Sequence, residues 1–275
     1  MKRGMGEKPI SWDLARKLGL AFAFAALLLA QLYFALAIEP SGASVSVVRS
    51  ERAPADSAGS VPAQAGNVTE LNIFGYSVTQ AWQGYFGNVT GTIELADATG
   101  NVLYNWSLAN PAGEVYASTN SSISWTNIQC FNFTADGTYT GSETPGATNL
   151  HGTNLSQLES QFNIAPDDVD GVDETFTLLG AGTHDLFYTA NLEFAEGECP
   201  NTRVYSASGT GVPNQFEEAL MYEPTTASVV FAALLEPGSV QGFDSNDYDF
   251  EMLVLEDGHA TDTSTTSYYF YVELE

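Results

Sequence analysis

The sequence predicts a mainly β protein, an antiparallel β-sandwich with short helical insertions, preceded by one N-terminal transmembrane helix. Three observations predict this class. An apolar stretch without a charged residue runs from Leu18 to Ile38. Beyond it, serine, threonine, tyrosine, valine and glycine are abundant, and turn residues recur about every 8 to 12 positions, as in antiparallel β structure. The basic residues also cluster before the apolar stretch, whereas the acidic residues follow it.

Residues 1–17 are predicted to be a cytoplasmic tail, and residues 18–38 the transmembrane helix. Five of the eight lysines and arginines precede Leu18, and no lysine follows Ile38. At about 1.5 Å per residue the apolar helix would span roughly 31 Å, close to the thickness of a hydrocarbon core. The basic end is expected to stay in the cytoplasm and the remainder to be exported.

Two other fates of the apolar segment stay open. Cleavage after Ala37 would fit the small-x-small rule of a secretory signal. Residues 16–19, Arg-Lys-Leu-Gly, also resemble a prepilin leader, although Phe24 stands where such leaders usually carry glutamate. We favour an uncleaved anchor because the apolar part is longer than a usual signal core and 17 residues precede it.

Residues 39–66 are predicted to be a disordered stalk. Alanine, serine, glycine and proline dominate there, and aromatic residues are absent, so little apolar area is available to offset the entropy of ordering.

Residues 67–275 are predicted to be one extracellular acidic β-sandwich domain, with a division into two sandwiches near residue 150 as the alternative.

The clearest element of that domain is a hairpin over residues 88–108. Apolar residues alternate on both sides of an Asp-Ala-Thr-Gly turn at residues 97–100. The predicted register places Leu95 opposite Val102 and Ile93 opposite Tyr104, and a bulge at the turn would shift it.

Further strands are predicted near residues 67–82, 113–118, 121–128, 174–179, 185–194, 202–207, 226–235, 248–255 and 267–274. Short helices are predicted over 154–162 and 214–222, because Ser156 with Glu159 and Asn214 with Glu217 have the spacing of a capping box.

In the last strand, alternation places Tyr269, Tyr271 and Glu273 on the outer face. Exposed tyrosines there could stack on sugars or pack against a neighbouring subunit. Burial of this face under a second layer is the alternative.

The exported part carries a large negative charge. From Glu39 onward, 32 aspartates and glutamates against 3 arginines give a net charge of −29. Such charge destabilises a compact state in dilute salt, whereas concentrated salt screens the repulsion. A salty exterior is therefore predicted, with divalent-cation binding or an ordinary acidic exported protein as alternatives. Nucleic acid is disfavoured as a partner because phosphates need basic residues.

Cys130 and Cys199 are the only cysteines, and their export predicts a disulfide, with two free thiols as the alternative.

Six Asn-x-Ser/Thr sequons are candidate glycosylation sites: Asn67, Asn88, Asn105, Asn120, Asn132 and Asn154. The hairpin register places Asn88 and Asn105 on the face opposite Tyr104 and Trp106, so glycans there would project outward.

Acidic residues crowd into the segment PDDVDGVDETF, where oxygen ligands at this density could hold Ca²⁺. The candidate metal ligands are Asp168, Asp170, Asp173 and Glu174. Their spacing does not fit an EF-hand, and a solvated acidic turn is the alternative. A weaker second candidate is Asp244, Asn246, Asp247 and Asp249.

Enzyme signatures are missing from the sequence. It contains no G-x-S-x-G, P-loop, H-E-x-x-H or dinucleotide fingerprint, and its three histidines are far apart in the chain. We therefore expect neither enzymatic activity nor a cofactor, apart from the candidate Ca²⁺.

Several segments resemble a family of uncharacterised archaeal cell-surface proteins with one N-terminal transmembrane segment. They are AGNVTELNI (65–73), WQGYFGNVTGTIELADATGNVLYNW (82–106), GEVYAS (113–118), DVDGVDETF (168–176) and YYFYVEL (268–274). The resemblance implies a shared β-rich exported domain and location, and it carries no catalytic residues.

These features together predict a membrane-anchored, glycosylated cell-surface protein with a structural or adhesive role. It would contact membrane lipid through residues 18–38, and envelope components or neighbouring copies through the exported domain. The alternatives are a pilin-like filament subunit and a carbohydrate-binding surface module.

Overall fold

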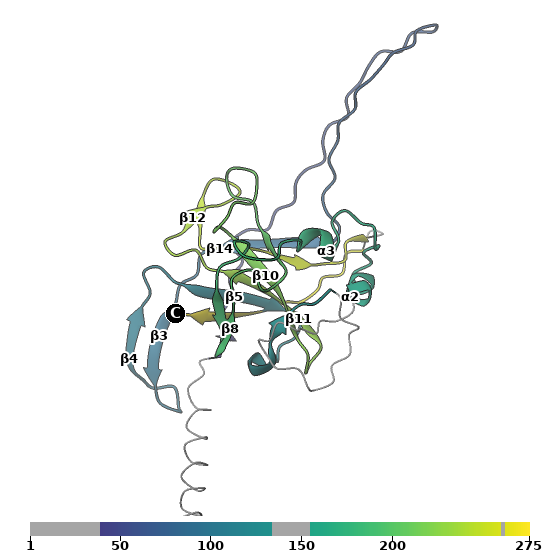
Figure 1. Ribbon diagram of the computed structural model, residues 1–275. Coiled ribbons are helices and arrows are strands. Elements are labelled where there is room, and N and C mark those ends of the chain that lie inside the picture. Colours follow the sequence, from purple (N-terminus) through teal and green to yellow (C-terminus); the bar gives the residue numbers. More distant parts are fainter. Residues whose placement is uncertain (1–38, 134–154, 260–261) are drawn as a thin grey trace, which may run out of the picture. The chain divides into compact units, whose positions relative to one another are not determined.

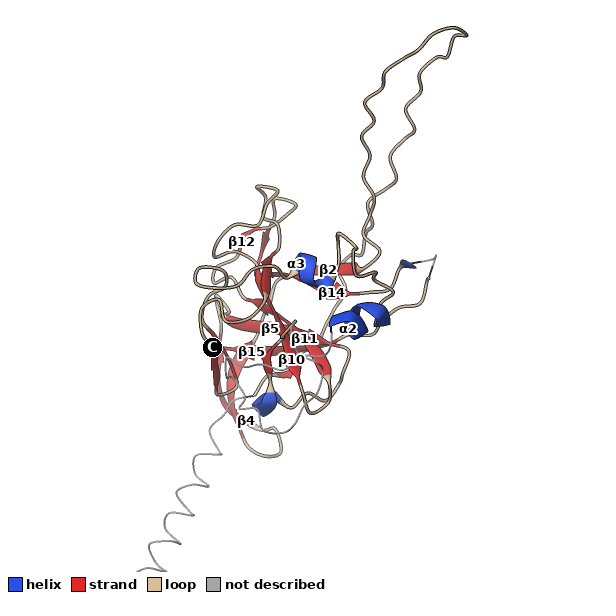
Figure 2. Cartoon of the chain, turned by 45° about the vertical axis from the view of Figure 1, so that its right-hand side comes forward, coloured by secondary structure: helices blue, strands red, loops and turns tan. Residues whose placement is uncertain are grey.

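The computed structural model describes residues 39–133, 155–259 and 262–275, which form a mainly β, antiparallel fold with two short α-helices (Figures 1 and 2). The predicted tail and transmembrane helix, residues 1–38, lie outside these ranges. Within them, no helix has the length and apolar composition that a membrane crossing requires.

A seven-stranded sheet is the centre of the fold, and all its strand pairs are antiparallel. Its order is β1 (Ser41–Gly42), β15 (Tyr269–Leu274), β5 (Gly113–Ser118), β11 (Ser228–Leu234), β10 (Glu217–Glu223) and β6 (Gln129–Cys130), and β9 (Asn201–Arg203) also pairs with β10. The C-terminal strand β15 is thus inserted between the first strand and β5.

Side chains alternate across this sheet and are buried on both faces. On one face, Val115 and Phe231 join a core cluster that includes Met252. On the other face, Tyr116 and Val230 join a second cluster. Both faces are therefore covered by further layers, which explains why strands such as β10 are buried at every position.

The layer on the first face consists of the pair β2 (Trp82–Gly87) and β14 (Phe250–Leu255), with α2 (Leu155–Gln161) and α3 (Val172–Thr175) beside it. The second face is covered by the hairpin of β7 (Phe187–Thr189) and β8 (Leu192–Phe194) and by the 3₁₀ turn η1 (Trp125–Asn127). A small pair, β12 (Val240–Gln241) and β13 (Asp247–Tyr248), lies outside the main sheet.

The predicted hairpin is present as β3 (Thr92–Ala96) and β4 (Val102–Ser107). Its register differs from the prediction, because Ile93 pairs with Trp106 and Leu95 with Tyr104, and a bulge falls between Leu95 and Ala96. The turn moves the pairing by one residue, since Ala96 pairs with Val102, and the bulge moves it by one more. The total shift is even over most of the hairpin, so Ile93, Leu95, Tyr104 and Trp106 still share one face.

A long arm, residues 43–80, leaves the main sheet after β1 and leads to β2, which pairs with β14 in the layer on the first face (Figures 1 and 2). Residues 41–77 are all exposed. The Tyr76 hydroxyl donates to the Pro54 carbonyl at 2.7 Å and links the two limbs. The predicted stalk, residues 39–66, therefore includes a strand of the main sheet near its start, and its remainder forms part of a loop that leads to the layer on the first face.

Four of the predicted elements are wrong. Residues 214–222 form no helix, and β10 begins at Glu217. Residues 172–175 are helical, where a strand was predicted from 174. The region 121–128 holds the turn η1, and most of 67–82 belongs to the arm. The helix predicted over 154–162 is confirmed as α2.

Candidate functional site

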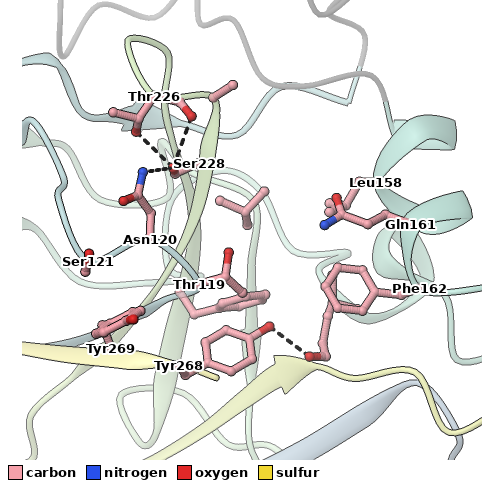
Figure 3. Close-up of a pocket in the computed structure, with 14 residues that line it drawn as sticks. Thr119, Asn120, Ser121, Leu158, Gln161, Phe162, Thr226, Ser228, Tyr268 and Tyr269 are labelled. Atoms are coloured by element: carbon pink, nitrogen blue, oxygen red, sulfur yellow. Dashed lines mark hydrogen bonds between the residues drawn. The ribbon is translucent and has the colours of Figure 1, made fainter. Parts of the chain in front are cut away.

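A pocket lies between α2, the end of β5 and the turn that joins β10 to β11 (Figure 3). It encloses about 370 Å³. Among the described residues, its lining consists of hydroxyl, amide, aliphatic and aromatic side chains, without a carboxylate or a basic group. The described part of this pocket is uncharged, which suits a neutral ligand.

The turn Glu223–Ser228 positions the hydroxyls of this pocket. The buried Glu223 carboxylate accepts hydrogen bonds from the backbone N–H groups of Thr225 and Thr226 at 2.7 and 2.8 Å, and from the Thr226 hydroxyl. Ser228 Oγ lies 2.9 Å from Thr226 Oγ1 and accepts from Asn120 Nδ2 at 2.9 Å. These contacts fix a row of polar groups on one wall (Figure 3).

Aromatic rings form the opposite side of the pocket. Tyr268 donates its hydroxyl to the Leu255 carbonyl at 2.8 Å, and burial raises the pKa of that hydroxyl. Tyr269 keeps 47% of its surface exposed beside it. A ring next to fixed hydroxyls and amides is an arrangement that can stack on a sugar and hydrogen-bond to it.

The face predicted for Tyr269, Tyr271 and Glu273 is exposed only at its first residue. Tyr271 is buried, packs edge-on against Trp125 and donates its hydroxyl to the Asn120 carbonyl at 3.0 Å. Glu273 is buried as well. The second layer over this face explains the difference.

The acidic segment 167–174 brings together two of the four predicted metal ligands. Asp173 and Glu174 lie with Glu159 of α2, and one carboxylate oxygen of each falls within 4.8 Å of the others. Burial raises the pKa of Glu159, and the charges of Asp173 and Glu174 add to this rise. A cation between the three oxygens would relieve their repulsion.

The other two predicted ligands face different partners. Asp168 accepts from the Ala165 backbone at 2.7 Å and so closes its own turn. Asp170 accepts from the Thr79 hydroxyl at 2.6 Å, and its carbonyl accepts from Trp82 Nε1 at 2.6 Å. These contacts fasten the acidic segment to the start of β2. Sequence spacing could not reveal Glu159 as a neighbour, because it comes from another element.

In the second candidate metal site, Asp244 and Asp249 also contact different partners. Burial would raise the pKa of Asp244, but hydrogen bonds from the Asn246 backbone and from Arg49 outweigh it and lower the pKa to about 2. Arg49 Nη2 lies 2.5 Å from Asp244 Oδ2 and belongs to the arm. Asp249 is buried and accepts from the Val89 backbone and from Ser239 Oγ, at 2.7 and 2.5 Å.

A set of buried carboxyls was missed by the sequence reading. Glu114 of β5 and Glu273 of β15 are cross-strand partners, and both are buried. Burial, with the charges of Glu273 and Glu275, raises the pKa of Glu114 to about 9. Tyr116 Oη lies 3.4 and 3.5 Å from the two carboxylates. The available signal was a glutamate inside each of two otherwise apolar strands.

Glu114 also borders a second cavity, of about 310 Å³, together with Glu217 and Glu236. Burial raises the pKa of Glu236 to about 7. Glu236 accepts from the Phe216 backbone at 2.5 Å, and Arg203 Nε lies 3.5 Å from Glu217 Oε1. These carboxyls therefore hold the turn before β10 and the end of β11 in place.

The predicted disulfide is confirmed: Cys130 of β6 is bonded to Cys199, just before β9, with a Cα–Cα distance of 4.9 Å. Both sulfurs lie in the second core cluster. The backbone N–H of Cys199 donates to Nε2 of the buried His184 at 3.0 Å. The bond ties two strands at the same edge of the sheet.

The sequons differ in exposure. Asn67, Asn88 and Asn105 are exposed, whereas Asn120 and Asn132 are half-buried. Asn154 lies outside the described residues. Exposed amide groups are accessible for glycan transfer, so glycosylation stays a prediction with its best geometry at the first three positions.

Comparison with models of protein families, with curated proteins and with solved structures finds no match to this chain.

Proposed function

We propose that the chain is a membrane-anchored, glycosylated archaeal surface protein whose acidic C-terminal domain lies outside the cell and has a structural or adhesive role. The main sheet and its covering layers would belong to the β-sandwich class. The observation that carries the proposal is the Cys130–Cys199 disulfide. It lies in the acidic part, on the opposite side of the apolar segment from the basic tail, and disulfides persist in oxidising compartments.

The order of charges along the chain supports the same orientation. Basic residues flank the apolar segment on its N-terminal side, and a positive flank stays in the cytoplasm. The exposed sequons and the acidic surface lie on the other side.

A structural or adhesive role is supported by how the titratable groups are arranged. The described carboxyls that depart most from their ordinary pKa values, such as Glu114 and Glu218, are buried within strands. Glu218 accepts from the Leu253 backbone at 2.8 Å and so joins β10 to β14. Carboxyls placed in this way belong to the interior of the fold.

Protease added to intact cells tests the location. Because the domain would lie outside, it should be digested, with the first cuts in the exposed arm at residues 43–80. If the C-terminal part is digested only after the cells are permeabilised, the proposal fails.

The mature N-terminus distinguishes the variants of this proposal. Mass spectrometry should find Met1 if the segment is an uncleaved anchor. Leu20 would indicate a pilin-like filament subunit, and Ile38 would indicate secretion.

The uncharged pocket favours carbohydrate binding as a second candidate function. Tyr269 and Asn120 offer a ring and an amide at its edge. A glycan array should give a signal that Tyr269→Ala removes and Tyr205→Ala retains, because Tyr205 is more exposed than Tyr269 but does not line the pocket. Equal signals from the two variants would contradict this function.

A further inference from the structure

The hairpin β3–β4 has one apolar face that the described residues leave uncovered. Ile93, Leu95, Tyr104 and Trp106 lie on this face and retain 39%, 51%, 59% and 50% of their surfaces exposed. The Tyr104 and Trp106 rings contact each other, with centroids 4.8 Å apart. Such a contiguous aromatic and aliphatic face is typical of an interaction surface.

The opposite face of the hairpin is mostly polar. Thr92 pairs with Ser107 there, and Glu94 pairs with Asn105, which is a sequon. The hairpin is therefore amphipathic. The Glu94 carboxylate and the sequon residue Asn105 are both directed away from the rings.

The base of the hairpin lies at the C-terminal end of β15. A Cβ atom placed on Gly91 would fall 2.3 Å from Leu274 Cδ1, so the backbone before β3 touches that side chain. The N–H of Leu108, just after β4, donates to the Gly91 carbonyl at 3.4 Å. Figure 1 shows the C-terminus beside β3.

The chain enters the sheet at this same end. Ser41 pairs with Val272 and Gly42 with Tyr271, and the strands are antiparallel, so Pro40 and Glu39 run toward Leu274. Pro40 is buried. Only these two residues separate Ser41 from the predicted apolar segment, so the connecting chain is at most about 11 Å long, even when it is fully extended.

We propose that the apolar face of β3–β4 lies in the interface of the bilayer that holds residues 18–38, with Tyr104 and Trp106 at the level of the headgroups. This inference rests on the proposed membrane anchoring. The two-residue link brings this end of the domain to the membrane surface, and amphipathic rings of tyrosine and tryptophan favour that level. The contact is apolar rather than ionic, since neither strand contains a basic residue.

The full chain reconstituted in phosphatidylcholine vesicles, with and without brominated acyl chains, tests this contact. The difference in tryptophan emission between the wild type and Trp106→Phe gives the contribution of Trp106. Brominated lipid should quench this contribution. The corresponding difference for Trp125→Phe should be unaffected, because Trp125 is buried in the second core cluster. Quenching should persist in concentrated salt.

Two neighbouring substitutions supply a matched control. Tyr104→Ser should reduce the quenching of Trp106, whereas Leu103→Ser should leave it unchanged. Leu103 is the more exposed of the two, at 80%, but it lies on the opposite face. Equal effects of both substitutions would overturn the inference.

An alkaline carbonate wash separates this inference from the anchoring on which it rests. A chain that stays in the vesicles while Trp106 escapes quenching overturns only the hairpin contact. A chain that is washed out overturns both. If Trp106 is protected from a water-soluble quencher but not quenched by bromine, a second copy of the chain covers the face and the lipid contact is refuted.

Discussion

The buried pair Glu114 and Glu273 makes stability depend on pH in a direction unusual for carboxyls. The two face each other across β5 and β15, and their partners are hydroxyls and backbone groups, such as the Ala190 N–H at 2.9 Å from Glu273 Oε2. Burial, reinforced by the charges of Glu273 and Glu275, raises the pKa of Glu114 from 4.5 to about 9. The folded protein therefore keeps the Glu114 proton at pH 7, whereas the unfolded chain has released it.

The sign and size of the effect follow from this difference. The stability contributed by the protonated Glu114 is complete below pH 4.5 and is lost as pH rises toward 9. Each pH unit in that window removes about 1.4 kcal/mol, so the free energy of unfolding should be about 3 kcal/mol lower at pH 7 than at pH 4.5 on account of this group. Glu114→Gln needs no proton and should recover most of that loss at pH 7.

Equilibrium urea unfolding of the full chain in mild detergent, followed by tryptophan fluorescence at pH 4.5 and 7, measures both quantities. Glu114→Gln should exceed the wild type at pH 7 and match it at pH 4.5. Glu70→Gln removes an exposed carboxylate of the arm and should leave the stability unchanged at both values. If Glu114→Gln destabilises the protein at pH 7, the carboxyl is ionised in the folded state and the reasoning is refuted.

Three further outcomes are expected. Cys130→Ser combined with Cys199→Ser should lower the free energy of unfolding by about 4 kcal/mol, because the bond closes a loop with a sequence separation of 69 residues; a loss below about 1 kcal/mol would contradict that. The melting temperature of the wild type should rise steadily with sodium chloride as the acidic surface is screened, and a flat response would argue against salt adaptation. Ca²⁺ should raise the melting temperature of the wild type but not of Asp173→Asn; a shared response would exclude the cluster of Glu159, Asp173 and Glu174 as the calcium site.

The sequence predicted the class of structure and the helix α2, but the same capping signal failed at Asn214. The backbone N–H of Asn214 does donate to Glu217 Oε1 at 3.0 Å, as a capping box requires. The residues that follow nevertheless form β10, which is buried at all seven positions. A local contact could not reveal that this segment has strands on both sides, because burial on both faces removes the alternation that identifies a strand.

The candidate sites show the same limit. Alternation placed Tyr271 and Glu273 on one face of the last strand correctly, but it contains no information on how many layers cover the sheet. Spacing grouped the acids of residues 167–174, yet their direction is set by contacts with α2 and with the start of β2. The disulfide was predictable because the chain offers a single pair of cysteines.

The arm has a consequence for how the protein could leave the cell. It is the only covalent connection between β1 and the strands that follow, and residues 43–77 are exposed. After one cut, the severed domain would be retained by noncovalent contacts, among them the pairing of Ser41 and Gly42 with β15, the hydrogen bond from the Ala43 N–H to the Phe270 carbonyl and, for a cut beyond Arg49, its ion pair with Asp244. Under the proposed membrane anchoring, shedding of the acidic domain would thus need one peptide bond to be hydrolysed and these contacts to separate, and the segment before the cut would stay behind.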